Sequence, residues 1–287
     1  MDYQHYRNEV EKIDLDDYVK TGEGGTATSY THKTRNSVAK LYKPGIEADK
    51  AKADFLTART VFEIGVPTPE PYRLITDGER FGAEYELIKD KRSFSRIISE
   101  EPERLQEVSV LFAQKALELH ATKVDTSHVR SMKEIMHRFY TEKNGVPEFF
   151  RLKALNFIEK VPDAPYCVHG DFQISNIITD GTRVLWIDVG DFCYGVPEWD
   201  LAWSFGMLHR IPDDRADYIF HLNREALCTH WKIFFSTYLG TDDSQKIADA
   251  EKGFEPYFGI RLPYMMDMAN LPAPSESVFN YFSKFLE

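Results

Sequence analysis

The sequence predicts an α+β fold, in which a strand-rich N-terminal part precedes a larger, mostly helical part. Strand-like runs separated by turns dominate up to about Ile88, whereas after Lys91 the apolar residues recur with the period of a helix. A third observation is the strand-loop-strand segment Tyr166–Asp188, which interrupts the helical part with acidic and amide side chains. We therefore divide the 287 residues into an N-terminal lobe, 1–88, and a C-terminal lobe, 89–287.

The composition is that of an ordinary globular protein, with 43% hydrophobic and 28% charged residues. The sequence contains no apolar run long enough to span a bilayer and no signal peptide. We therefore expect a cytoplasmic protein that does not associate with membranes. The three cysteines lack Cys-x-x-Cys spacing and predict neither disulfides nor a zinc site. A net charge of -11 argues against nucleic-acid binding and permits a cationic substrate without requiring one.

The N-terminal strands begin with a glycine cluster. Gly22, Gly24 and Gly25 lie within the strand-like stretch Ile13–Tyr42. Glycines let a backbone approach a ligand closely and point its N–H groups at phosphate oxygens, but they also make simple hairpin turns. The strand Ser37–Lys43 that follows favours the phosphate-binding interpretation.

The remaining elements of the N-terminal lobe are a helix and a hairpin. Residues Ala51, Phe55, Ala58 and Phe62 recur at helical steps and predict a helix over Glu47–Glu63, which Gly65 can cap. Three prolines then enforce an extended segment. Tyr72–Ile75 and Phe81–Ile88 are predicted as a hairpin about Asp77-Gly78.

The C-terminal lobe is predicted to be helical on both sides of the central segment. Apolar periodicity and flanking prolines place helices at Pro102–His120, Met132–Tyr140, Pro147–Val161, Trp199–His209, Asp213–Leu222, Ala226–Leu239 and Ser277–Leu286. Aromatic residues are frequent after Ala202, and most are expected to pack between helices.

The central segment concentrates the chemistry. Asp171 and Asn176 lie five positions apart in a loop, and the apolar run Val184–Ile187 ends at Asp188. Magnesium favours oxygen ligands and usually takes one or two carboxylates plus substrate phosphates, so Asn176 and Asp188 would suffice. Asp171 is then left to orient a hydroxyl proton. The alternatives are a capped turn for Asp171, and for Asn176 a role in holding the loop.

The motif order resembles that of a known family. His169-Gly170-Asp171, Asn176 and Asp188, followed by the Gly195–Ala202 element that is similar to Gly-x-Pro-x-x-Asp-Leu-Ala, resemble the aminoglycoside phosphotransferase and choline kinase family. The resemblance extends over roughly Tyr18–Ala202. It implies a protein-kinase-like two-lobed fold, with an antiparallel sheet and one main helix in an N-terminal nucleotide-binding lobe. The C-terminal lobe would then hold the catalytic loop and the acceptor-substrate site.

The resemblance also implies roles for individual residues. Around the nucleotide, it assigns two sets of residues to the phosphates: the glycines Gly22, Gly24 and Gly25, and the lysine Lys40. Asp54 would form an ion pair with Lys40, in place of the glutamate that is usual in the family. Val38 would contact the adenine, and Glu86 and Ile88 would belong to the hinge between the lobes. In the catalytic loop, it assigns Asp171 to the acceptor hydroxyl, Asn176 and Asp188 to the metal, and His169 and Asp200 to support. Three roles stay open for Asp191: to assist a second metal, to meet a basic substrate, or to form a turn.

These assignments predict a kinase that uses ATP and Mg²⁺ and transfers the γ-phosphate to an alcohol group of a small molecule. An aminoglycoside-, choline- or sugar-like acceptor fits equally. The alternative is a catalytically silent pseudokinase that binds nucleotide and acts through partners; Asp54 and Ser175 depart from the family pattern and keep it open. Only a short interval separates Asp188 from Gly195, which leaves no long activation segment for a protein substrate. The sequence does not indicate the oligomeric state.

Overall fold

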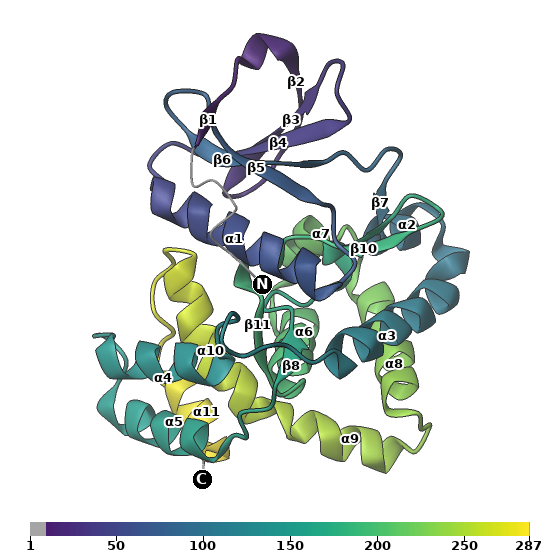
Figure 1. The fold of residues 1–287 in the computed structure, drawn as a ribbon. Helices are drawn as coiled ribbons and strands as arrows, with labels where there is room; N and C mark the ends of the chain where they lie inside the picture. Colours follow the sequence, from purple (N-terminus) through teal and green to yellow (C-terminus); the bar gives the residue numbers. More distant parts are fainter. Residues whose placement is uncertain (1–9, 287) are drawn as a thin grey trace. The chain divides into compact units, whose positions relative to one another are not determined.

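The computed structural model describes residues 10–286 and divides them into two compact units (Figure 1). The first unit comprises residues 10–91 and Ile178–Asp191. The second comprises Arg92–Ile177 and residues 192–286. The part of the central segment from Ile178 to Asp188 therefore belongs to the first unit, whereas the predicted division at Ile88 places the whole segment in the C-terminal lobe.

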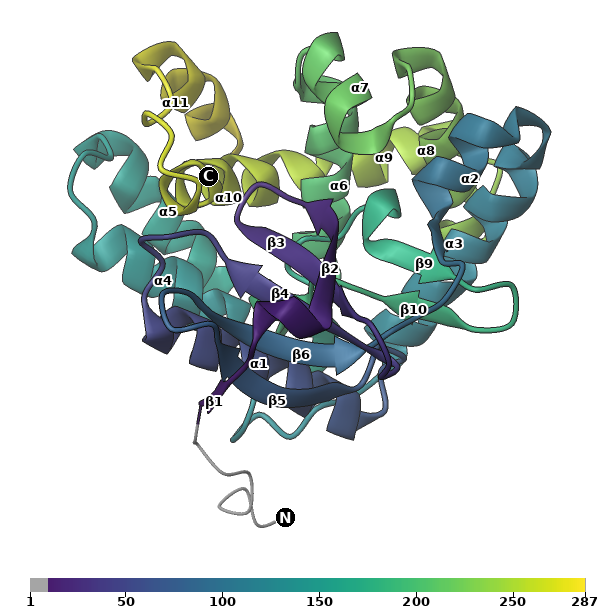
Figure 2. The same ribbon diagram turned by 90° about the horizontal axis from the view of Figure 1, so that it is seen from above.

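The first unit is built on a six-stranded sheet in the order β1-β5-β6-β4-β3-β2. The strands are β1 (Glu11–Lys12), β2 (Tyr18–Glu23), β3 (Ala27–His32), β4 (Ser37–Tyr42), β5 (Pro71–Thr76) and β6 (Phe81–Glu86). β1 runs parallel to β5, and the other neighbours are antiparallel, which confirms the predicted sheet. Figure 2 shows the strands from above, with α1 behind them.

Helix α1 (Ala48–Ile64) covers one face of this sheet, as the periodicity predicts. Its buried Phe55 packs on Leu74 of β5 and Ala83 of β6. Gly65 ends the helix with a φ of 92°, a left-handed conformation that glycine adopts without steric cost. Because Lys40 lies opposite Ala83 in the β4–β6 register, its side chain belongs to the face that α1 covers.

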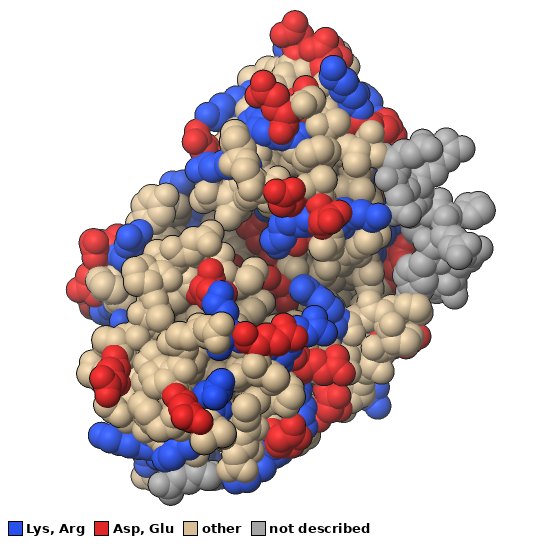
Figure 3. Space-filling model, turned by 90° about the vertical axis from the view of Figure 1, so that its left-hand side faces the viewer, with Lys and Arg blue, Asp and Glu red and all other residues tan. Residues whose placement is uncertain are grey.

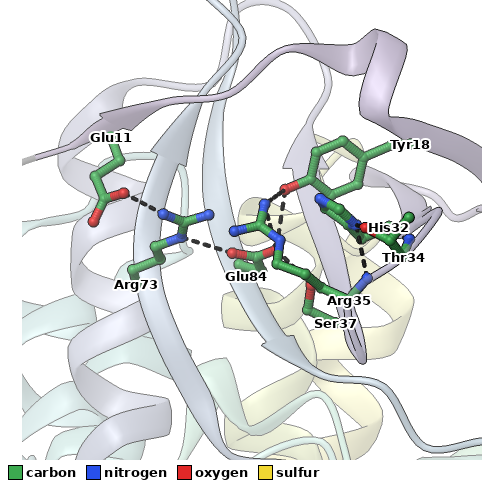
Figure 4. A network of polar contacts seen from close by, with 8 residues as sticks. All are labelled: Glu11, Tyr18, His32, Thr34, Arg35, Ser37, Arg73 and Glu84. Atoms are coloured by element: carbon green, nitrogen blue, oxygen red, sulfur yellow. Dashed lines mark hydrogen bonds and ion pairs between the residues drawn. The ribbon is translucent and has the colours of Figure 1, made fainter.

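The opposite face of the sheet holds a buried polar network (Figure 4). Glu84 of β6 is only 3% exposed, and its carboxylate accepts hydrogen bonds from Tyr18 at 3.0 Å, Ser37 at 2.6 Å and Arg73 at 2.6 Å. Burial raises the pKa of Glu84, but these hydrogen bonds and the charge of Arg73 outweigh it, so the pKa is lowered. The network fixes β4 between β6 and the N-terminal strands.

A hairpin from the middle of the sequence completes the first unit. Strands β9 (Ile177–Thr179) and β10 (Val184–Trp186) are neighbours in a second sheet. Ile178 and Leu185 form an apolar cluster with Ile88, which is 3% exposed. After β10 the chain passes through the 3₁₀ turn η5 (Val189–Asp191), which packs on α1. Asp191 therefore occupies a turn position.

The second unit is mostly helical, as predicted. Its helices are α2 (Phe94–Glu100), α3 (Leu105–Ala121), α4 (Met132–Glu142), α5 (Glu148–Lys160), α6 (Glu198–Arg210), α7 (Asp213–Phe220), α8 (Arg224–Leu239), α9 (Ser244–Lys252), α10 (Phe254–Met268) and α11 (Glu276–Phe282). Every predicted helix is present, and α2, α9 and α10 are additional. The helical C-terminal part and the sheet together confirm the predicted α+β class.

Two contacts within the second unit involve elements next to the loop that carries Asp171. Strand β8 (Tyr166–Val168) leads into that loop and pairs antiparallel with β11 (Cys193–Gly195). Helices α6 and α10 approach closely at Gly206, where a Cβ atom would lie 2.0 Å from the ring of Phe258. A side chain at that position would therefore force the two helices apart.

The surface shows no segregation of charge on the face in Figure 3, where basic and acidic side chains are intermingled. Among residues 10–286, no helix combines the length and the apolar character that crossing a membrane requires.

Candidate active site

The residues predicted for the site fall into two sets, one in each unit. Lys40, Asp54 and Asp188 belong to the first unit, together with the residues predicted for the phosphates and the adenine. Asp171 and Asn176 belong to the second. Each set is built by its own unit and can be described by itself.

In the first set, the Lys40 ammonium donates a hydrogen bond to the carboxylate of Asp188, 148 positions later in the chain. The two side chains are 37% and 47% exposed, so a ligand can reach both. Asp188 has a φ of 56°, a left-handed conformation that typically costs a non-glycine residue about 1–3 kcal/mol and is often found at functional sites. Burial lowers the pKa of Lys40, but the charge of Asp188 outweighs it and the pKa is raised.

In this structure Lys40 pairs with Asp188 while Asp54 makes other contacts, and an ion pair between Lys40 and Asp54 stays a prediction. Asp54 accepts hydrogen bonds from the Tyr42 hydroxyl and, at 2.6 Å, from Lys50. Tyr42 lies two positions after Lys40 on the same face of β4, and the aspartate side chain is one methylene shorter than the glutamate usual in the family. Burial raises the pKa of Tyr42, and the charge of Asp54 adds to this effect. Asp54 still acts on Lys40 through its charge, which helps to raise the lysine pKa.

Gly24 and Gly25 lie in the turn between β2 and β3, whereas Gly22 lies within β2. The N–H of Gly24 donates to the carbonyl of Ala27 at 2.8 Å, and the strand register shifts between Lys20 and Gly22. A Cβ atom at Gly25 would meet no atom within 4 Å, so the space around it is open. The hairpin-turn alternative is thus realised, while phosphate binding by Gly22, Gly24 and Gly25 stays a prediction.

The residues predicted for the adenine lie where β4 begins and β6 ends. Val38 lies opposite Tyr85, on the face of the sheet that carries Lys40. The N–H of Glu86 donates to the carbonyl of Glu70 at 2.8 Å, and the Glu86 carboxylate pairs with Arg183. Adenine binding by Val38, Glu86 and Ile88 stays a prediction.

The second set centres on Asp171, whose carboxylate accepts three hydrogen bonds from neutral side chains. Asn176 and Gln173 donate at 2.8 and 3.1 Å to Oδ2, and Trp203 donates at 3.2 Å to Oδ1. Asn176 also donates to the backbone carbonyl of Asp171 at 2.8 Å. The structure thus brings Asp171 and Asn176 together, and Asn176 holds the loop through its amide nitrogen. Its amide oxygen is the atom that a cation would take.

The loop that carries Asp171 is anchored by Asp200, which is fully buried. Asp200 accepts hydrogen bonds from the backbone N–H groups of His169 at 2.6 Å and Gly170 at 3.0 Å, and from His120 Nε2 at 3.2 Å. Burial raises the pKa of Asp200, but the His120 hydrogen bond and the charges of His120, His169 and Arg261 outweigh it, so the pKa is lowered. The supporting role predicted for Asp200 matches these contacts.

Two residues of this site were not predicted. Trp203 directly follows the Asp-Leu-Ala motif, one helical turn after Asp200, and this spacing is a signal that could have identified it. Arg261 of α10 is 0% exposed and donates hydrogen bonds to the carbonyls of Trp199, at 2.9 Å, and Gly170. Its only signal in the sequence is a lone basic residue within an apolar, aromatic stretch.

The chemistry of the predicted magnesium ligands can be checked against the donor set. Within residues 10–286, no group of three or more His, Cys, Asp or Glu side chains gathers as a metal site. Magnesium is often held by one or two protein oxygens, with phosphate oxygens and water completing the octahedron. The carboxylate of Asp188 and the amide oxygen of Asn176 fit that chemistry, and their role as ligands stays a prediction.

Known proteins resemble this chain in sequence and in fold. A model of the phosphotransferase enzyme family matches residues 20–223. The aminoglycoside phosphotransferase APH(4)-Ia, solved as a thermostable mutant in ternary complex with ADP and hygromycin B, is 13% identical with a TM-score of 0.58, covering 94% of this chain and 92% of its own. An ethanolamine kinase from Plasmodium vivax is 13% identical with a TM-score of 0.54, covering 95% and 82%.

A choline/ethanolamine kinase family protein from Mesorhizobium loti is 12% identical with a TM-score of 0.51, covering 94% of this chain and 85% of its own. At such identities the likeness establishes the fold alone, and this fold is the predicted one. No curated protein matches the chain in sequence.

Proposed function

Because the chain belongs to the phosphotransferase enzyme family, we propose that it transfers the γ-phosphate of ATP, with magnesium, to a hydroxyl group of a small molecule. The observation that carries this proposal is the Lys40–Asp188 ion pair, which joins the predicted phosphate-binding lysine to the predicted metal ligand. Phosphoryl transfer depends mainly on positioning and on neutralising phosphate charge. A lysine and a carboxylate that are both accessible are suited to that task.

On the nucleotide side, Lys40 binds the phosphate oxygens as a fixed cation. A lysine ammonium is charged at physiological pH. Asp188 and Asn176 would hold the magnesium ion, which neutralises charge on the transferred phosphate when it is bound. Gly22, Gly24 and Gly25 would let the backbone of β2 and the following turn come close to the phosphates, because they carry no side chain.

On the acceptor side, Asp171 orients the attacking hydroxyl and accepts its proton. Three hydrogen bonds hold its carboxylate in one orientation, and such preorganisation lowers the cost of reaching the transition state. Gln173 is one of the three donors that hold this orientation.

The proposed acceptor is an aminoglycoside-, choline- or sugar-like molecule, and the enzyme would act in the cytoplasm. Structures with this fold include an aminoglycoside phosphotransferase in complex with ADP and hygromycin B and a protein named an ethanolamine kinase. A net charge of -11 is compatible with a cationic acceptor.

The proposal is tested with Asp171→Asn against Asp242→Asn, which removes the same charge from an exposed loop between α8 and α9. We expect Asp171→Asn to abolish phosphate transfer, measured on a panel of aminoglycosides, amino alcohols and sugars, while calorimetry still detects magnesium-ATP binding. Asp242→Asn should retain full transfer. Near-normal turnover by Asp171→Asn would reject the assignment. Magnesium-ATP binding by the unmodified protein without product from any acceptor would favour the pseudokinase instead.

A further inference from the structure

We infer that Trp203 is a positioning residue of Asp171 and that Arg261 of α10 holds both of them in place. The inference rests on the proposed function of Asp171. It extends the catalytic machinery to position 261, beyond the residues 20–223 that the family model matches.

The first step is the division of labour at the Asp171 carboxylate. Asn176 and Gln173 both donate to Oδ2, whereas Trp203 donates to Oδ1. A carboxylate held at one oxygen can still swing the other. The indole N–H of Trp203 therefore fixes the plane of the carboxylate, and with it the direction from which an acceptor hydroxyl is met.

The second step is the rigidity of the Trp203 ring. Its side chain lies in the core at 5% exposure and stacks on Phe258 of α10, with ring centroids 5.8 Å apart and planes inclined by 28°. The guanidinium carbon of Arg261 lies 5.0 Å from the centroid of the same ring, within the range of a cation–π contact. Both neighbours come from α10, so this helix sets where the indole N–H points.

The third step is the position of Arg261 itself. Burying a charge is costly unless its hydrogen bonds are made, and Arg261 directs two of its donors to the carbonyls of Trp199 and Gly170. Gly170 immediately precedes Asp171 in the chain. Arg261 therefore holds the backbone directly before Asp171 as well as the ring that orients the Asp171 carboxylate. The charge of Arg261 also helps to lower the pKa of the buried Asp200 carboxylate.

The competing explanation is that Trp203 only fills the core. The chain offers a matched control for it, because Trp231 of α8 donates its indole N–H to Glu251 at 2.8 Å and is equally buried at 3% exposure. Replacing either residue by phenylalanine removes one indole donor from one carboxylate. Of these two tryptophans, Trp203 is the one that donates to Asp171.

The kinetic test compares Trp203→Phe with Trp231→Phe. A hydrogen bond to a charged group is worth about 1.5–3 kcal/mol, so Trp203→Phe should lower kcat by about 10- to 100-fold. The KM for ATP should stay within about twofold, because positioning acts on the transition state and not on nucleotide binding. Trp231→Phe should leave kcat unchanged within the same margin. A kcat of Trp203→Phe equal to that of Trp231→Phe would overturn the inference.

A second measurement does not depend on activity. The protein contains four tryptophans, so isotope-labelled indole groups give four N–H signals in a heteronuclear NMR spectrum, which single Trp→Phe variants assign. We expect Asp171→Asn to shift the Trp203 signal and to leave the Trp231 signal in place. An unmoved Trp203 signal would overturn the contact even if transfer is observed. A shifted signal would sustain the contact even if no acceptor is found and the proposed function fails.

Arg261→Lys tests whether Arg261 holds the Trp203 ring and the backbone before Asp171 in place. Lysine keeps the charge but lacks the planar fork that reaches two carbonyls at once. We expect this variant to lower kcat and to move the Trp203 indole signal, with the KM for ATP again within about twofold. An unchanged Trp203 signal in a folded Arg261→Lys protein would remove Arg261 from the proposal.

Discussion

The ammonium of Lys40 and the carboxylate of Asp188 form an ion pair in which each charge is the other's partner while both side chains stay accessible. Exposed pairs of this kind contribute little to stability, with a median of about 0–1 kcal/mol. We therefore infer that this ion pair serves ligand binding and not stability. A phosphate can take over the lysine, and a magnesium ion can take over the carboxylate, without leaving either charge buried and unpaired.

The first prediction concerns this lysine. Lys40→Met should weaken magnesium-ATP binding by about tenfold or more, because it removes a fixed cation from the phosphates. Lys43→Met is the matched control, since Lys43 lies three residues later, just beyond the end of β4. Calorimetry with magnesium-ATP measures both. Equal affinities of the two variants would contradict a phosphate-binding role for Lys40.

The second prediction separates two carboxylates. Asp54→Asn should weaken magnesium-ATP binding less than Asp188→Asn, because Asp54 accepts hydrogen bonds from Tyr42 and Lys50 and reaches Lys40 only through its charge. Asp188→Asn removes both the partner of Lys40 and the proposed metal ligand. Titration of each variant with magnesium-ATP measures the difference. A larger loss in Asp54→Asn would restore Asp54 as the principal partner of Lys40.

The behaviour of these residues shows what the sequence could and could not predict. Helix α1 and the loop with Asp171 and Asn176 follow from apolar periodicity and motif spacing, which are local properties. Which of the two carboxylates, Asp54 or Asp188, pairs with Lys40 is not determined by local sequence. It depends on the turn η5 packing on α1, where a Cβ atom at Gly190 would lie 3.3 Å from Cγ of Asp54.

Arg261 marks the other limit of sequence reasoning. Its importance comes from hydrogen bonds to Gly170 and Trp199, residues 91 and 62 positions away. No motif spacing connects such distant positions, and α10 itself carries an internal proline. Only the packing of α10 on α6 reveals the contact.

The third prediction concerns that packing. Gly206→Ala would gain up to about 1 kcal/mol of helix propensity in an isolated helix. In this protein the added Cβ atom would lie 2.0 Å from the buried Phe258 ring, and overpacking of this kind typically costs about 1–3 kcal/mol. The cost of overpacking should exceed the gain in helix propensity, so the free energy of unfolding measured in urea should fall. Gly25→Ala, where a Cβ atom meets nothing within 4 Å, should leave it unchanged.

The fourth prediction is a pH dependence of stability that arises from His230. Burial lowers the pKa of this residue from 6.5 to about 3, and its Nδ1 lies 2.9 Å from Ser109 Oγ. Because the folded pKa is below the unfolded one, unfolding takes up a proton at His230 when the pH is between these two values. The stabilisation is therefore complete above pH 6.5 and is lost progressively as the pH falls toward 3.

The size of this effect follows from the linkage relation. Each pH unit below the unfolded pKa costs about 1.4 kcal/mol, so His230→Gln should lose about 1 kcal/mol less stability than the unmodified protein between pH 7 and about pH 5.5. Urea unfolding at the two pH values measures the difference. His128→Gln, which alters an exposed histidine, should show the slope of the unmodified protein. If His230→Gln also keeps that slope, His230 is not the neutral buried histidine that its surroundings require.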